Sequence, residues 1–173
     1  MAGPTLRLLA RALGTSLAND LRQVPATNVI FRHAHSMDEL PMSDAKAHAE
    51  SRPALMEILK IVAPDVILIV STSAYRLFSR EDVTQLQEDT GTITSPNGTH
   101  NAVIFKTASG YVPALQKHVR LIMTGYPSKF AGRPEWELVE QRCEEEFKHQ
   151  GLNPMVQQKW RTQLTALPDH HDA

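Results

Sequence analysis

The run Asp65–Val70 constrains the fold of this chain more than any other segment. It reads Asp-Val-Ile-Leu-Ile-Val, follows Ala63-Pro64, and shows no alternation of polar and apolar residues. A strand of this kind is typically buried on both faces, as in the middle of a parallel sheet that helices cover on either side. We therefore expect a central strand here.

Helical patterns lie on both sides of this strand. Apolar residues recur at helical spacing in three segments, which are 5–21, 43–62 and 134–150. Pro53 interrupts the second pattern and predicts a kink or a break near Ser51. Polar residues 79–90 read as weakly helical.

Further strands are predicted at 28–31 and 119–124, and a hairpin around Asn97-Gly98. Alternating helices and strands predict an α/β fold, namely a three-layer α/β/α sandwich with a short, mainly parallel central sheet. We expect one domain over residues 1–167, followed by a flexible tail at 168–173.

Composition excludes several classes of protein. The single cysteine among 173 residues excludes a disulfide framework and a cysteine-ligated zinc or iron–sulfur site. The absence of an 18-residue apolar run predicts no membrane contact, and we expect a cytoplasmic protein. A net charge of −1 argues against coating nucleic acid by bulk electrostatics, but it permits a local basic groove.

Ligands in open α/β sheets bind where strands end and loops begin. Ser71 and Thr72 follow the central strand and could offer hydroxyls and backbone amides to an anion. The alternative is that they only cap a helix. His33, His35 and Asp38 could bind a transition metal, but a solvated loop is the simpler interpretation, so we expect no metal and no cofactor.

The most specific of these turns follows the strand at 119–124. Gly125, Tyr126, Pro127 and Ser128 form a proline-bent turn, and three residues after it could contact a ligand, which are Lys129, Phe130 and Arg133. The alternative is an ordinary connection in which Phe130 folds back onto the core.

Together these segments resemble the uracil-DNA glycosylase superfamily. The resemblance runs over about Leu6 to Gly132 and depends on four short motifs in order: Thr27-Asn28-Val29, a helix interrupted at Ser51-Arg52-Pro53, the strand Val66–Val70 followed by Ser71 and Ala74, and Tyr126-Pro127-Ser128. It implies a DNA-repair protein that recognises a nucleotide extruded from the DNA stack.

The resemblance also implies roles for individual residues. Asn28 would hydrogen-bond the edge of the base, and Tyr126 matches the position that stabilises charge on the departing base. Ser128 would contact a backbone phosphate, with further DNA contacts from the following residues: Lys129, Phe130 near the apolar wedge that fills the emptied stack, and Arg133.

Two departures bear on catalysis. No glycine- and proline-rich motif with the water-activating acid precedes the first helix, and Tyr126 replaces a histidine or asparagine. We therefore expect recognition of a flipped base in DNA and leave hydrolysis of the N-glycosidic bond open. The alternatives are a catalytically inactive α/β protein that binds a nucleotide or protein partner, and a metal-assisted hydrolase using His33, His35 and Asp38.

The family's first strand is also missing, and its loss would leave unpaired backbone groups in the sheet. We expect that 102–105 fills the gap, that a second copy or a protein partner completes the sheet, or that the chain extends upstream.

Overall fold

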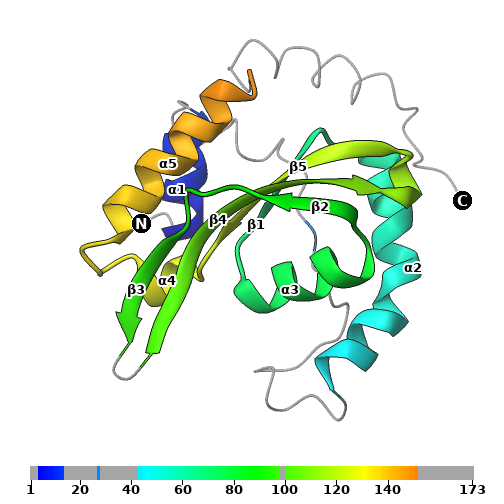
Figure 1. The fold of residues 1–173 in the computed structure, drawn as a ribbon, viewed down its shortest axis with the longest axis horizontal. Helices are drawn as coiled ribbons and strands as arrows, with labels where there is room; N and C mark the ends of the chain where they lie inside the picture. Colours follow the sequence, from blue (N-terminus) through cyan, green and yellow to red (C-terminus); the bar gives the residue numbers. More distant parts are fainter. Residues whose placement is uncertain (1–3, 14–26, 28–42, 98–99, 152–173) are drawn as a thin grey trace, which may run out of the picture. The chain divides into compact units, whose positions relative to one another are not determined.

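The computed structural model describes residues 4–13, 27, 43–97 and 100–151 (Figure 1). Its elements are α1 (Pro4–Leu13), α2 (Asp44–Val62), β1 (Val66–Ile69), α3 (Thr72–Glu81), β2 (Thr84–Glu88), β3 (Ile93–Asn97), β4 (His100–Val112), the 3-10 helix η3 (Pro113–Leu115), β5 (Lys117–Thr124), α4 (Pro127–Phe130) and α5 (Trp136–His149). The predicted strand at 28–31, the second half of the helix predicted at 5–21 and the tail at 168–173 lie outside the described residues.

The chain divides into two compact units, which are described separately. Unit 1 comprises residues 1–24 and 131–173, and unit 2 comprises residues 25–130. The single domain expected over 1–167 stays a prediction.

Unit 2 contains a mixed sheet in the order β1-β5-β4-β2, with β3 also paired to β4. Only β1 and β5 run parallel, whereas the other three pairs are antiparallel. The α/β class is confirmed, but the expectation of a mainly parallel sheet is wrong. The connections from β3 to β4 and from β4 to β5 are only a few residues long, and such short links join antiparallel neighbours.

Strand β1 lies at the end of the sheet formed by the described strands, and only Ile69 of its four residues is buried. The strand predicted at 28–31 lies outside the described residues, so the central place expected for β1 stays a prediction. The segment 102–105 belongs to β4, where it pairs with β3, and Phe105 also pairs with β5. It therefore does not fill a place beside β1.

One face of the sheet carries the hydrophobic core of unit 2. Figure 1 shows α2 and α3 beside the sheet, and their apolar residues pack with those of β4 and β5. The cluster includes Leu55, Met56, Leu59, Ile69, Tyr75, Phe78, Val112, Leu121 and Met123. The third layer of the expected sandwich remains an expectation, because α1 and α5 belong to unit 1.

Helix α2 is continuous through Pro53, so the break that was one of two alternatives near Ser51 is wrong, and the kink stays a prediction. Its first turn is capped by Ser43, whose side chain accepts a hydrogen bond from the backbone N–H of Lys46. Beyond Pro53, Leu55 and Leu59 are buried in the core. Helix stability in proteins comes mainly from such packing, which here outweighs the backbone hydrogen bond that the proline removes.

The weakly helical reading of residues 79–90 is correct only at its start. Helix α3 ends at Glu81, and β2 then pairs antiparallel with β4. The pairing is irregular between Thr84 and Gln87, and Gln85 has a positive φ of 53°. Pairing with a long neighbouring strand therefore overrides the local preference of a polar sequence.

In unit 1, α1 and α5 pack through apolar stripes. The predicted stripe of α5 is confirmed, since Trp136, Val139, Cys143 and Phe147 are all buried. Arg11 of α1 forms an ion pair with Glu140 of α5, with 2.7 Å between Nη1 and Oε2. No helix in the described ranges is both long and apolar enough to cross a bilayer.

Candidate functional site

The parallel pair β1–β5 brings two of the predicted turns to one edge of the sheet. Val66 pairs with Arg120, and the register continues to Ile69 and Met123. The two strands therefore end side by side, and their carboxyl ends lead directly into 71–72 and 125–128. Carboxyl ends of neighbouring parallel strands are where open α/β sheets bind ligands.

Ser71 serves as the N-cap of α3. Its backbone is extended, and its hydroxyl oxygen accepts a hydrogen bond from the backbone N–H of Ala74 at 3.3 Å. The predicted helix start is thus confirmed. Thr72, the first residue of the helix, is half-buried. The anion-binding role of Ser71 and Thr72 stays a prediction.

The turn after β5 is held by backbone hydrogen bonds. The N–H of Gly125 donates to the carbonyl oxygen of Ile104, and the carbonyl of Tyr126 accepts from the N–H groups of Lys129 and Phe130. The two bonds to the Tyr126 carbonyl form the single helical turn α4, in a segment that the sequence indicated as a turn. Tyr126 is 58% exposed, so its ring is available to a ligand.

Phe130 is not the exposed aromatic group that the sequence suggested, and the alternative, in which it folds back and is buried, is the one observed. It is buried at 6% exposure. A side chain added at Gly125 would come within 2.8 Å of the Phe130 ring. The missing side chain of Gly125 therefore leaves the room that the ring occupies, and the aromatic group that this turn exposes is Tyr126 instead.

The polar residues after Pro127 are accessible. Ser128 and Lys129 are exposed, and the ammonium nitrogen of Lys129 lies 5.7 Å from the centre of the Phe130 ring. Arg133 belongs to unit 1, and its position relative to this edge is not described. Three of the predicted site residues, which are Tyr126 for the departing base and Ser128 and Lys129 for DNA contacts, are thus exposed in one short turn.

Sequence reasoning missed Thr124, the last residue of β5. It is fully buried, and its hydroxyl oxygen has no hydrogen-bond partner. No pattern in the sequence marks this threonine, because a single hydroxyl inside an apolar run is common in strands. Only its surroundings in the fold make it unusual.

Two predicted sites fall outside the described residues. Asn28 is one, and the cluster of His33, His35 and Asp38 is the other. Across the described ranges, no group of three or more histidine, cysteine or acidic side chains is arranged to hold a metal ion.

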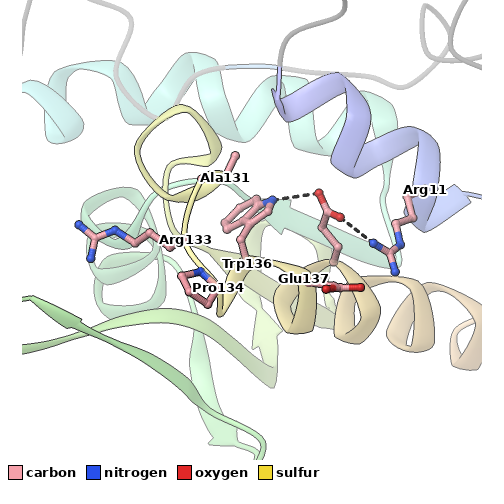
Figure 2. A pocket seen from close by; sticks show the side chains of 8 residues that line it. Arg11, Ala131, Arg133, Pro134, Trp136 and Glu137 are labelled. Atoms are coloured by element: carbon pink, nitrogen blue, oxygen red, sulfur yellow. Dashed lines mark hydrogen bonds and ion pairs between the residues drawn. The ribbon is translucent and has the colours of Figure 1, made fainter.

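Unit 1 contains an open hollow of about 510 Å³ (Figure 2). Its lining comprises Arg11, Ala131, Gly132, Arg133, Pro134, Trp136, Glu137 and Glu140. Glu140 accepts hydrogen bonds from the indole of Trp136 at 3.0 Å and from Arg11 at 2.7 Å, so both of its oxygens are engaged within the protein. This arrangement joins α1 to α5 and presents no uncompensated charge from Glu140 to a ligand.

Comparison with known proteins gives no match: neither a family model, nor a curated protein, nor a solved structure is similar enough to this chain.

Proposed function

We propose that this chain is a divergent uracil-DNA glycosylase-like protein that binds a base extruded from DNA at the carboxyl ends of β1 and β5. The observation that carries the proposal is the parallel register of these strands, which places the turns at 71–72 and 125–128 side by side. In the resemblance drawn from the sequence, these are the last two of four motifs in order. The first, with Asn28, would supply the carboxamide that reads the base.

The surface chemistry of the turn supports DNA as the ligand. Tyr126 offers an exposed aromatic ring on which a base can stack, and Lys129 offers a positive charge to a phosphate. Ser128 adds an exposed hydroxyl between them. Such local contacts are compatible with the net charge of −1 of the whole chain.

We propose that the chain recognises the base, and we do not extend this to hydrolysis of the N-glycosidic bond. Neither 70–75 nor 125–133 contains an aspartate or glutamate that could activate water. This observation favours the alternative function, a catalytically inactive domain that binds a nucleotide or a protein partner. An assay for abasic sites on uracil-containing single- and double-stranded DNA separates the two, because only an enzyme produces them.

Binding is tested by fluorescence anisotropy with two labelled oligonucleotides that differ by one uracil in place of cytosine, whose polar edge has a different pattern of donors and acceptors. The wild-type protein should bind the uracil strand at least about tenfold more tightly, which is within the range that one well-placed polar contact supplies. Equal affinity for the two strands would refute the proposal.

The Asn28→Asp substitution tests the first motif in the same assay. It should abolish the preference for uracil, because a carboxylate repels the carbonyl oxygen that the carboxamide would bind. Asn101→Asp is the matched control, since Asn101 is exposed on β4 and has no role in the proposed site. A preference for uracil that survives Asn28→Asp would remove Asn28 from the site.

A further inference from the structure

The ring of Phe130 anchors the turn that follows β5. Phe130 is buried, although the two residues before it, Ser128 and Lys129, are exposed. Its backbone N–H donates to the carbonyl oxygen of Tyr126 at 3.1 Å, and its ring packs so closely on Gly125 that an added side chain there would come within 2.8 Å of it. Phe130 therefore ties the end of the turn to its start, and close packing of this kind leaves the turn little room to move.

The same ring contacts the exposed cation of the turn. The ammonium nitrogen of Lys129 lies 5.7 Å from the centre of the Phe130 ring. A cation within about 6 Å of a ring centre is attracted to the electron-rich face of the ring. This attraction occupies none of the oxygen acceptors that an ammonium group prefers, so its three N–H donors stay available to an anion.

Most other lysines of the described residues have their charge compensated within the protein. Four of them pair with a carboxylate at 2.6 to 2.8 Å, and they are Lys60, Lys106, Lys117 and Lys148. Lys106 also lies beside a ring, 5.9 Å from the centre of Tyr75, but Glu88 neutralises it. Residues 125–133 contain no acidic side chain, and within the described ranges Lys129 forms no ion pair. Its charge is thus held by a ring and left uncompensated.

We infer that Phe130 is a positioning residue of the proposed DNA site, and that its buried ring holds the ammonium group of Lys129 where it can bind a backbone phosphate. This inference rests on the function proposed above. It gives Phe130 a role inside the protein, where the ring orders the turn and does not enter the DNA stack. A lysine side chain that is already ordered loses less conformational entropy when it binds a phosphate, so the affinity is higher.

The experiment is a double-mutant cycle of Phe130→Leu and Lys129→Gln, measured by fluorescence anisotropy with the uracil and the cytosine oligonucleotides. Leucine keeps an apolar side chain in the same place and removes the aromatic face. Phe130→Leu should weaken binding of both oligonucleotides about two- to fivefold, which is the size of a cation–π interaction at an exposed site. The preference for uracil should not change, because a phosphate contact carries no information about the base. In the Lys129→Gln background, Phe130→Leu should have little further effect, since no cation remains to be positioned.

Two further variants separate positioning from a general loss of stability. Phe78→Leu makes the same change at a phenylalanine that is also buried, in the core that α2 and α3 form with the sheet. Both leucine variants should lower the melting temperature by about 2–6 °C, but Phe78→Leu should leave DNA binding unchanged. Phe130→Tyr keeps the aromatic ring and should bind DNA as tightly as the wild type.

Four results would overturn the inference: wild-type DNA affinity in Phe130→Leu, an equal loss of affinity in Phe78→Leu, an equal loss in Phe130→Tyr, or a loss that is as large in the Lys129→Gln background. If the wild-type protein binds both oligonucleotides equally well, the proposed recognition of uracil is refuted, whereas the cycle still decides the role of Phe130. A wild-type protein that binds neither oligonucleotide would refute both.

Discussion

Two parts of unit 2 differ in whether their buried polar groups have hydrogen-bond partners. Between α2 and the end of α3, the carboxylate of Asp82 is fully buried and accepts hydrogen bonds from His48, at 2.9 Å, and from Arg52. At the end of β5, the hydroxyl of Thr124 is equally buried but has no partner. Both groups were removed from water, and only the first is compensated.

The first group lies between two helices of the core, whereas the second lies next to the turn that we propose as the binding site. The cluster of His48, Arg52 and Asp82 joins two helices that cover the same face of the sheet, and its groups satisfy one another. The edge at Thr124 and Tyr126 combines an unpaired hydroxyl with an exposed aromatic ring. Sites that bind ligands commonly keep such unfavourable features, because binding compensates them.

The largest effect is expected from Asp82→Ala. Removing the shared acceptor deletes the hydrogen bond of the buried His48 ring and the ion pair of Arg52, and the unfolding free energy should fall by about 3–5 kcal/mol. Asp65→Ala is the control, since Asp65 pairs with Lys117 at the surface and its loss should cost about 1 kcal/mol or less. Urea denaturation measures the unfolding free energy of both variants. Equal losses would show that the buried hydrogen bonds of Asp82 stabilise the fold no more than a surface ion pair does.

Gly125→Ala tests the packing at the other region. The new methyl group would lie within 2.8 Å of the Phe130 ring, so either the ring or the strand end must move. The expected loss is about 1–3 kcal/mol of unfolding free energy. Gly132→Ala is the control, because no atom lies within 4 Å of the added group. A neutral Gly125→Ala would mean that α4 is not anchored by this contact.

Lys129→Gln should change DNA binding without changing stability. If Lys129 contacts a phosphate, the slope of log binding constant against log salt concentration becomes shallower by about 0.7–0.9. Lys60→Gln removes another exposed charge, which pairs with Glu57 on α2 and lies far along the chain from the proposed site, and should leave the slope unchanged. Identical slopes for the two variants would exclude Lys129 from the interface.

The smallest effect is expected from the pH dependence of Asp89. Partial burial raises its pKa, but hydrogen bonds from Thr107 and Arg120 and the charge of Arg120 lower it by more, so the folded pKa lies below the ordinary value. The carboxylate therefore stabilises the fold above its unfolded pKa, and this contribution is lost as the pH falls through the folded pKa. The stability difference between wild type and Asp89→Asn should shrink between pH 7 and pH 3, and a constant difference would contradict the assignment.

The sequence predicted local structure well where hydrophobic pattern and capping agree. Ser71 begins α3 as expected, Val66–Ile69 forms a strand, and the apolar stripe of α5 is buried. Each prediction depends on residues within one or two turns of each other. The predicted turn residues at the candidate site also occur where strands end, because strand boundaries follow from the same local pattern.

Pairing partners were not predictable in this way. The sequence reads residues 79–90 as weakly helical, whereas Thr84–Glu88 forms β2 and pairs with β4. It reads β1 as central, and among the described strands β1 lies at the end of the sheet. Pairing joins residues that are distant along the chain, and a polar strand can be stabilised by a neighbour that its own sequence does not reveal.

Sequence alone determined that this chain combines helices and strands and that a proline-bent turn follows an apolar strand. The tertiary structure decided that Phe130 packs on Gly125 while Tyr126 is exposed, and that Thr124 is buried without a partner. The physical reason is that exposure and hydrogen-bond satisfaction depend on which distant segments surround a side chain, and one-dimensional spacing does not carry that information.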